Sequence, residues 1–552
     1  MPVKAQKFYP YAIIFIIASL LFIPYLGSVH LFDWDEINFA ESAREMIVTG
    51  DYNTVRIDFE PFWQKPPLFI LMQALSMKIF GINEFAARFP NVVCGIITLM
   101  FLFGAGRRLY NERFGVLWAL AYVGSVLPFF YFKSGIIDPW FNLFIFVGIW
   151  FSIRFLEVNA GEENRAKRHL YVIGSAAAIG LGILTKGPVA LLVWGVTAFV
   201  YAVYKQFRIP VRWYHIAEFV CVLLLTGGSW FLGQILTGNK QVVIDFINYQ
   251  IVLFQTQDAG HGGFFMYHFV ILLIGVFPVS LYSLAAYRKT VSDSSAQKDF
   301  KTWMIILLWV VLIIFSIVKT KIVHYSSLCY FPLTFLGAHV LYHYCYQNFQ
   351  LKKWIHVSMI VVAAIFATLI LLVTNISHFT SYIIENQLFD DPFALANLQA
   401  DAGWTGFEPL VALAPLSVIF FAIYFYRKQK PRQYTASVLI SSCLFVWLTM
   451  IVVVKRVEAY SQRAAIEFFK SKQNEDCYIV TLGYKSYAHY FYGTTQQSMK
   501  NVLQYLKNEE ETNLPVYVST KNIYKERVLD SHPQLEVLYE KNGFVFLKKN
   551  PQ

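Results

Sequence analysis

The chain of 552 residues is 57% hydrophobic and only 15% charged, with a mean hydropathy of +0.47. This composition excludes an ordinary soluble protein, which needs a more polar surface, and indicates a membrane protein. The net charge of +11 does not indicate nucleic-acid binding, because the basic residues cluster in short loops between apolar runs, as they do where they orient membrane helices.

About thirteen apolar runs have the roughly 20-residue length that a helix needs to cross a bilayer. They lie near residues 10–29, 89–106, 114–132, 137–155, 169–185, 188–204, 215–236, 264–286, 302–318, 325–343, 354–374, 409–426 and 435–454. The division at Lys186-Gly187-Pro188 cuts one long hydrophobic stretch in two. With the N-terminus on the cytoplasmic side, the basic loops fall inside. We therefore predict an all-α polytopic protein of the plasma (inner) membrane with a periplasmic C-terminus.

The first outer loop, residues 30–88, is long and contains two amphipathic stretches. Residues 36–48 and 68–80 predict helices that lie along the membrane interface. Phe32-Asp33-Trp34-Asp35-Glu36 places three carboxylates at the outer end of the first span. Such a group could act as a general base or bind a cation, or it could cap the following helix. The spacing alone favours neither interpretation.

Three further outer positions carry isolated charges. Lys65 lies in Trp63-Gln64-Lys65-Pro66-Pro67, whose prolines stiffen the loop. An ammonium held there suits a lipid phosphate, although a lysine that merely extends along apolar surface to reach water is the alternative. Asp138 begins the fourth span, where a helix cap is the plain explanation. Lys186 lies in a minimal outer turn, although cations of membrane proteins concentrate in the cytoplasmic loops, and an anionic ligand is one reason for a lysine there.

Two more outer loops contain titratable side chains. Lys319-Thr320-Lys321 is followed by His324 and Tyr325, and Asp258-Ala259-Gly260-His261-Gly262-Gly263 is a glycine-rich loop. Acids and lysines on one side of a membrane are typical of chemistry in which a base activates an acceptor while cations hold a departing phosphate. We therefore expect them to meet in one pocket at the outer membrane boundary. The outer carboxylates and His261 could also bind a divalent metal ion, but no spacing demands one and no cofactor is certain.

Residues 456–552 are the only soluble-looking part of the chain and are set apart from the membrane part, residues 1–455. Helical stretches at 459–472 and 499–506 alternate with strand-like runs at 477–482, 516–519, 535–539 and 544–547. Asn542-Gly543 between the last two runs is a strong hairpin signal. We predict a small C-terminal exoplasmic α/β domain.

In these residues the sequence resembles the lipid A aminoarabinose transferases and, more distantly, the protein O-mannosyltransferases, both of them GT-C membrane glycosyltransferases. The resemblance covers roughly residues 10–345, and its ordered strings are specific to the family rather than to one substrate. The strings are Asp35-Glu36, Ala40-Glu41-x-x-Arg44-Glu45-Met46, Gly50-Asp51, Lys65-Pro66, Phe80-Gly81, Arg88, Asp138-Pro139, Thr185-Lys186-Gly187, Asp258-Ala259-x-His261 and Phe315-Ser316-x-x-Lys319-x-Lys321.

The resemblance implies a GT-C fold and an inverting transfer of a sugar from undecaprenyl phosphate to an envelope acceptor such as lipid A or protein. No nucleotide sugar would be needed. It implies catalytic roles for Asp35, Glu36 and Asp138. Donor-phosphate contacts are implied for Lys65, Lys186, Lys319 and Lys321, and places around the substrate cavity for Asp258, His261, Tyr325 and Arg88.

The sequence departs from the aminoarabinose enzymes at two places. Asn38 and Phe39 stand where those enzymes have an Arg-Tyr pair, and Gln64 replaces an acid. Either change could alter recognition of an amino sugar or of an anionic acceptor. Two other functions stay open: a polymerase or ligase of lipid-linked glycans, and a transporter, which is disfavoured because transporters bury their charges at mid-helix.

Overall fold

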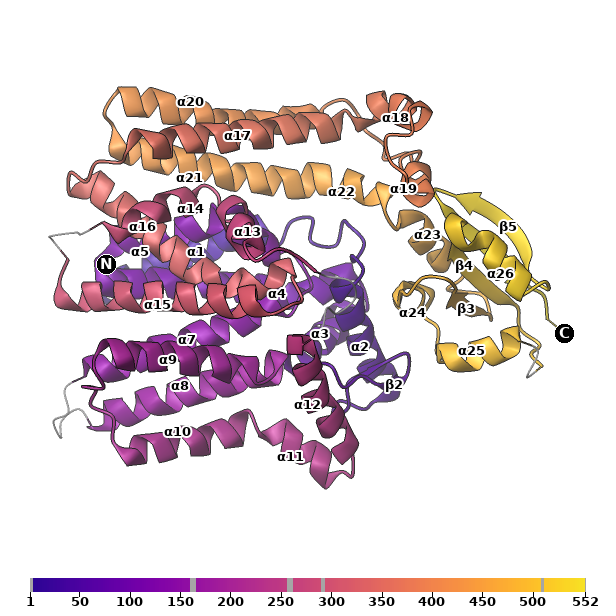
Figure 1. Cartoon of the computed structure of the whole chain (residues 1–552), viewed down its shortest axis with the longest axis horizontal. Coiled ribbons are helices and arrows are strands. Elements are labelled where there is room, and N and C mark those ends of the chain that lie inside the picture. Colours follow the sequence, from indigo (N-terminus) through magenta and orange to yellow (C-terminus); the bar gives the residue numbers. More distant parts are fainter. Residues whose placement is uncertain (1–2, 159–164, 256–261, 289–292, 508–510, 552) are drawn as a thin grey trace.

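The computed structural model describes residues 3–158, 165–255, 262–288, 293–507 and 511–551. Most of the chain forms long helices that run side by side, and a small sheet with its own helices lies beyond one end of them (Figure 1). The first outer loop, which contains α2 and α3, lies between these two parts (Figure 1).

The long helices identify a multi-span membrane protein. Within the described ranges, seven helices are long and apolar enough to cross a membrane, or up to nine if each of two bent helix pairs is one span. The seven are α4 (Glu84–Leu109), α7 (Asp138–Glu157), α8 (Arg165–Lys186), α15 (Ser295–Ile317), α17 (Lys353–Thr374), η5 with α20 (Glu408–Arg427) and the helix that begins with α21 (Pro431–Tyr460). The bent pairs are α10 (Trp213–Thr226) with α11 (Ser229–Leu236), and α13 (Tyr267–Gly275) with α14 (Val279–Ser283) and the turn after it. A membrane protein with several spans is therefore confirmed, while the number thirteen stays a prediction.

The other apolar runs form shorter or interrupted helices. They are α1 (Val3–Phe22), α5 (Glu112–Val123), α6 (Val126–Tyr131), α9 (Val189–Tyr204) and α16 (Tyr330–Tyr346). The long stretch divided at Lys186-Gly187-Pro188 does break there, since α8 ends at Lys186 and Gly187 has a φ of +103°. Only glycine adopts that backbone conformation readily, and the following proline has no N–H to continue the helix. This part also contains α12 (Lys240–Gln255), α18 (Ile376–Glu385) and α19 (Pro392–Asn397), while α22 (Val454–Val457) belongs to the last long helix.

The first outer loop folds into α2 (Asp35–Thr49), the short strands β1 (Arg56–Ile57) and β2 (Glu60–Pro61), and α3 (Leu68–Phe80). Both helices occupy the positions that the amphipathic stretches predict. However, α2 is not a surface helix, because every residue from Glu36 to Met46 is buried between α3 and the C-terminal part of the chain. Its polar side chains pair with one another instead of facing water, as Arg44 does with Glu41 at 2.8 and 2.7 Å.

The C-terminal residues form a four-stranded mixed sheet in the order β3-β4-β6-β5, in which β3 is parallel to β4 and the other pairs are antiparallel. The strands are β3 (Tyr478–Thr481), β4 (Val516–Lys521), β5 (Glu536–Lys541) and β6 (Phe544–Lys549), with helices α23 (Arg463–Ser471), α24 (Ala488–Gly493), α25 (Met499–Leu506) and α26 (Lys525–Ser531). Asn542 and Gly543, both with positive φ, make the tight turn of the last hairpin.

The sheet and its helices pack directly on the first outer loop. One hydrophobic cluster contains Phe39 and Phe69 from that loop together with Phe469, Tyr490 and Phe546 from the C-terminal part. Burial of such aromatic side chains contributes roughly 2 kcal/mol each. The two parts are therefore held together by a common apolar core.

Candidate active site

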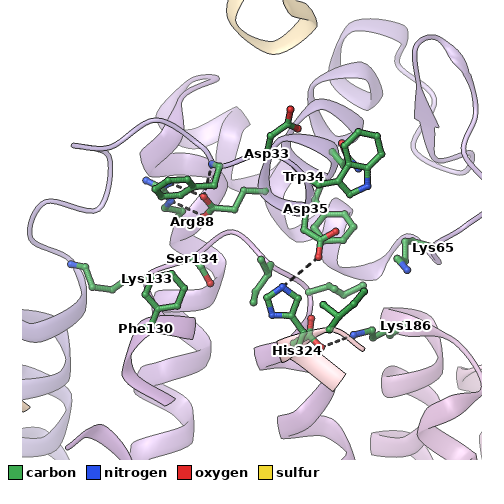
Figure 2. Close-up of a pocket in the computed structure, with 18 of the residues that line it drawn as sticks. Asp33, Trp34, Asp35, Lys65, Arg88, Phe130, Lys133, Ser134, Lys186 and His324 are labelled. Carbon is green, nitrogen blue, oxygen red and sulfur yellow. Dashed lines mark hydrogen bonds and ion pairs between the residues drawn. The ribbon is translucent and has the colours of Figure 1, made fainter. Parts of the chain in front are cut away.

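A cavity of about 730 Å³ lies where the first outer loop meets the ends of the long helices. Segments distant in the sequence contribute to its wall, among them the predicted site residues Asp35, Lys65, Asp138, Lys186 and Tyr325. A smaller cavity of about 60 Å³ shares these residues except Asp35. The structure therefore brings Asp35, Lys65 and Lys186 together at one cavity, as the charge pattern predicts (Figure 2). Asp138 lines the same cavity.

Asp35 is the first residue of α2, and its side chain is 37% exposed. Its carboxylate points toward His324, whose Nε2 atom lies 3.7 Å from Oδ2 (Figure 2). The other ring nitrogen of His324, Nδ1, is 2.8 Å from the hydroxyl of Tyr131. A solvated carboxylate beside an oriented imidazole can accept a proton from a substrate hydroxyl in the cavity.

Asp138 and Lys186 form an ion pair of 2.5 Å between the start of α7 and the end of α8. The Asp138 side chain is 2% exposed and that of Lys186 is 15% exposed, so the pair is largely desolvated. The Lys186 ammonium also lies 5.6 Å from the ring of Phe141 and 5.4 Å from that of Tyr325. These contacts fix the charge at the cavity wall.

Glu36 lines the cavity, but both oxygens of its carboxylate accept hydrogen bonds from other groups of the protein. Arg88 donates to both oxygens at 2.9 and 2.8 Å, and the backbone N–H groups of Phe32 and Gly135 donate at 2.9 and 2.5 Å. Burial alone would raise the pKa of Glu36, but Arg88 and these donors hold it below its usual value. The pair of Glu36 and Arg88 thus anchors the first loop, and the predicted catalytic role of Glu36 stays a prediction.

The predicted phosphate-binding lysines occupy different environments. Lys65 lines both cavities. Lys321 is buried, and its ammonium donates to the carbonyls of Phe315, Ser316 and Val318, which end α15. It therefore caps a helix, in keeping with the negative charge of helix C-termini. Lys319 is exposed and lines neither cavity. Asp258 and His261 lie outside the described residues.

Three further charged residues line the cavity: Asp33, Lys133 and Lys485. Lys485 comes from the C-terminal part, and its ammonium lies 5.0 Å from the ring of Trp34. Lys133 is buried, and burial lowers its pKa to about 8. Burial raises the pKa of Asp33 to about 6, against the opposing effects of Ser486 and a more distant lysine. Asp33 belongs to the acidic string Phe32-Asp33-Trp34-Asp35-Glu36 that stands out in the sequence, whereas no sequence signal singled out Lys133 or Lys485.

Metal binding in this cavity has little support from the described part of the chain. Among the described residues that line it, no three His, Cys, Asp or Glu ligand atoms lie within 4.8 Å of one another. The sequence leaves open a divalent ion held by the outer carboxylates and His261, and His261 lies outside the described residues.

Comparison with known proteins gives the family context. Residues 64–230 match the family model of dolichyl-phosphate-mannose-protein mannosyltransferases. The chain is 26% identical over 330 residues to the undecaprenyl phosphate-alpha-4-amino-4-deoxy-L-arabinose arabinosyl transferase of Photorhabdus laumondii, covering 59% of this chain and 58% of the relative. The resemblance to the GT-C membrane glycosyltransferases is confirmed. A second relative of the same description, from Edwardsiella ictaluri, is 27% identical over 351 residues, covering 61% of this chain and 59% of the relative. The matched stretch thus spans less than two thirds of these relatives.

Solved structures show that the GT-C fold extends over almost the whole chain. The crystal structure of ArnT from Cupriavidus metallidurans bound to undecaprenyl phosphate superposes with a TM-score of 0.75 at 17% identity, covering 98% of this chain and 99% of that one. The oligosaccharyltransferase of Archaeoglobus fulgidus in its apo form has a TM-score of 0.51 at 11% identity, covering 94% and 70%. The fold therefore reaches well beyond the stretch of detectable sequence similarity.

Proposed function

We propose that the chain is an inverting glycosyltransferase that moves a sugar from undecaprenyl phosphate to an envelope acceptor, with lipid A as the first candidate. The observation that carries this proposal is the convergence of Asp35, Lys65 and the Asp138–Lys186 pair on one cavity. The cavity volume of about 730 Å³ is suitable for a sugar phosphate together with part of an acceptor. The similarity to undecaprenyl phosphate aminoarabinose transferases supports the same donor class.

In the proposed reaction, the carboxylate of Asp35 accepts the proton of the acceptor hydroxyl as its oxygen attacks the anomeric carbon of the sugar. The bond between that carbon and the phosphate oxygen breaks, and its electron pair stays on the lipid phosphate. Lys65 and Lys186 stabilise the negative charge that develops there. Attack from the face opposite the phosphate inverts the anomeric centre.

Other residues position these groups. Asp138 holds the ammonium of Lys186, and the hydrogen bond between His324 and Tyr131 orients the imidazole beside Asp35. The smaller cavity next to the ion pair has a mainly apolar wall, which suits the first units of a polyprenyl chain. Its apolar residues are Phe141, Val189, Val193, Phe315, Val318 and Leu328.

The identity of the sugar and the acceptor would depend on positions where the sequence departs from its relatives. Asn38, Phe39 and Gln64, which replace an Arg-Tyr pair and an acid, all line the cavity. Lys485 supplies a cation from the C-terminal part and suits an anionic acceptor such as the phosphates of lipid A. We therefore place substrate selection at these residues and the transfer step at Asp35.

The proposed function also requires a particular arrangement in the membrane. We place residues 1–455 in the plasma (inner) membrane with about thirteen spans and a cytoplasmic N-terminus, and residues 456–552 outside as an exoplasmic α/β domain. The contact between the C-terminal part and the first outer loop supports this placement, because both would lie on the same face. Reporter fusions at each terminus test it.

Mass spectrometry of envelope lipids and proteins is the decisive test. Cells that produce the wild-type chain should contain one added sugar on an envelope component that is absent from cells without the chain. Cells that produce Asp35→Asn at equal membrane levels should lack it. A modification that persists in the Asp35→Asn cells, or no difference between cells with and without the wild-type chain, would contradict the proposal.

A further inference from the structure

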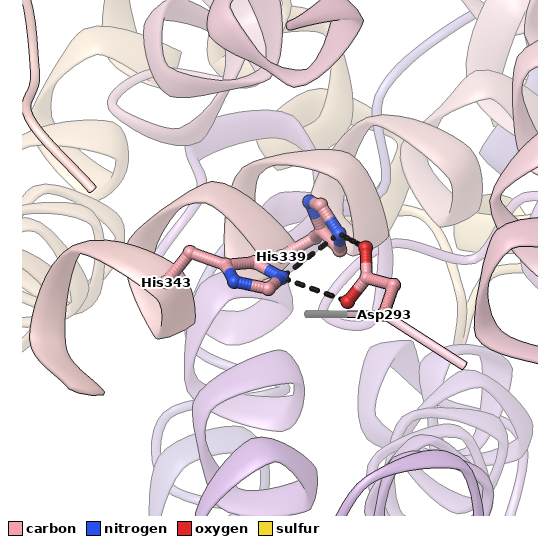
Figure 3. Close-up of side chains that lie close together, drawn as sticks. All are labelled: Asp293, His339 and His343. Carbon is pink, nitrogen blue, oxygen red and sulfur yellow. Dashed lines mark hydrogen bonds and ion pairs between the residues drawn. The ribbon is translucent and has the colours of Figure 1, made fainter. Parts of the chain in front are cut away.

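A second cluster of ionisable side chains lies far from the cavity. Asp293, just before α15, faces His339 and His343 on α16 (Figure 3). One carboxylate oxygen lies 2.9 Å from Nε2 of His339, and the other lies 3.0 Å from Nε2 of His343. The two Nε2 atoms are 3.1 Å apart. All three side chains are at most 2% exposed.

The spacing of the two histidines places them on one face of a single helix. Residues four apart lie above one another on an α-helix, which is why paired histidines at this spacing recur as metal ligands. The third ligand comes from a separate segment, so the three groups approach a common point from two directions. A carboxylate and two imidazoles are the ligand types that zinc and similar divalent ions prefer.

The distances suit an ion between the ligand atoms. Zinc bonds of about 2.0–2.1 Å to nitrogen and oxygen place neighbouring tetrahedral ligand atoms about 3.3 Å apart. One ligand atom from each residue lies within 4.8 Å of the other two, and the shortest separations of 2.9, 3.0 and 3.1 Å involve both oxygens of Asp293. A small rotation of the carboxylate and a few tenths of an ångström of expansion would therefore admit the ion. Without a metal, each imidazole can donate to Asp293, but then both protonated nitrogens point at the same small space.

The surroundings match those of a metal site. The hydroxyl of Tyr110 lies 3.3 Å from Oδ1 of Asp293 and can orient the carboxylate from outside the ligand set. Tyr110 follows directly after α4, so the cluster connects the end of α4, the start of α15 and the end of α16. An ion bound here would tie three helix ends together.

We propose that Asp293, His339 and His343 form a binding site for one divalent transition-metal ion of the zinc type, which fixes these helix ends. The site is structural rather than catalytic, because it lies at the start of α15, whereas the residues of this helix that line a cavity, such as Phe315, lie at its other end. The proposal is independent of the glycosyltransferase function.

Metal analysis of the full chain in detergent tests this site. Protein stripped with a chelator, incubated with Zn²⁺ and desalted should retain one zinc ion per chain, and Co²⁺ in its place should give a visible absorption band of a bound ion. The His339→Asn and His343→Asn variants should each fail to retain this zinc ion. His356→Asn is the matched control, because His356 is also a buried histidine but binds Tyr434 at 2.8 Å on another helix; it should retain the zinc.

Thermal unfolding gives a second readout that does not depend on catalysis. Added zinc should raise the midpoint of the wild type and of His356→Asn, because a ligand that binds only the folded chain stabilises it. The midpoint of Asp293→Asn should not respond to zinc. The proposal is overturned if the wild type retains no zinc, if the histidine variants retain as much as the wild type, or if Asp35→Asn removes the ion and so places it in the outer cavity.

Discussion

The Nζ atom of Lys186 lies 2.5 Å from Oδ1 of Asp138, where the end of α8 meets the beginning of α7. Both residues come from motifs that have a plain structural explanation when taken singly: a helix cap and a charged turn. The pairing changes that interpretation, because each charge needs the other to be stable in a largely buried place. It also leaves one positive side chain fixed at the wall of both cavities.

Replacing Lys186 by Met should therefore affect stability as well as activity. The variant leaves the carboxylate of Asp138 buried without a partner, so we expect a loss of about 3 kcal/mol in the free energy of unfolding. Sugar transfer should fall by at least about a hundredfold, because a phosphate-stabilising charge is lost. Denaturation in detergent and a transfer assay with purified donor measure the two effects.

The double variant Asp138→Asn with Lys186→Met separates the two effects. It removes both charges, so the free energy of unfolding should return most of the way to that of the wild type, a non-additivity expected for contacting residues. Transfer should stay low. If transfer recovers together with stability, Lys186 has only a structural role.

Asp35→Asn should abolish most of the transfer without unfolding the chain. The side chain is 37% exposed, and its ion-pair partner among the described residues is His324 at 3.7 Å, so little stability depends on it. Loss of a general base lowers the rate by about 10²–10⁴-fold. Asp390→Asn is the control, because Asp390 is an exposed acid that lines neither cavity. Near-normal turnover by Asp35→Asn would remove Asp35 from the mechanism.

The helical part of the fold follows largely from local patterns in the sequence. Apolar run length identifies the long helices, and the Gly187-Pro188 pair locates the break between α8 and α9. The burial of α2 could not be predicted from these local patterns, because its amphipathic pattern is equally typical of a helix on a membrane surface. Residues between Ala464 and Phe546, far along the chain, cover α2 through the hydrophobic cluster that contains Phe39 and Phe469.

Part of the candidate site could be predicted from the sequence, because charged residues are rare in an apolar chain and are therefore easy to recognise. Asp35, Lys65, Asp138 and Lys186 each stand out as costly charges at outer helix ends, and all four line the cavity. The sequence does not show, however, in which direction each of these side chains points. Lys321 looks the same as Lys65 in the sequence, yet its ammonium binds the carbonyl groups at the end of α15. Its conformation depends on how the chain turns after Val318, which no local pattern specifies.

Lys65→Ala should weaken binding of the lipid carrier. A lost charge-assisted contact with a phosphate corresponds to about 1.5–3 kcal/mol, or roughly a 10- to 100-fold increase in Kd. Titration of undecaprenyl phosphate into the detergent-solubilised chain measures the affinity. Lys319→Ala is the matched control and should leave Kd unchanged, because Lys319 is exposed and lines neither cavity. Equal weakening in both variants would assign Lys319 to the donor site, and unchanged affinity in Lys65→Ala would exclude Lys65 from it.

The buried acid Glu45 on α2 should make the stability of the chain depend on pH. Burial, followed by the nearby carboxylate of Glu41, raises the pKa of Glu45 to about 9 from a usual value of 4.5. Between these two values the folded chain holds a proton that the unfolded chain has lost. The free energy of unfolding must therefore fall as the pH rises through this window.

Glu45→Gln removes the titrating group but keeps an oxygen that can accept from the backbone N–H of Phe59, which donates to Glu45 at 3.0 Å. Its amide can also donate to Glu41, as a protonated Glu45 would. The thermal midpoint of the variant should consequently fall less steeply than that of the wild type from about pH 5 to about pH 9, with the largest difference at the alkaline end. Glu60→Gln, at an exposed glutamate on β2, should preserve the wild-type slope. Parallel slopes in the wild type and Glu45→Gln would show that Glu45 is ionised in the folded chain, and that Arg44 or water compensates its charge inside the buried face of α2.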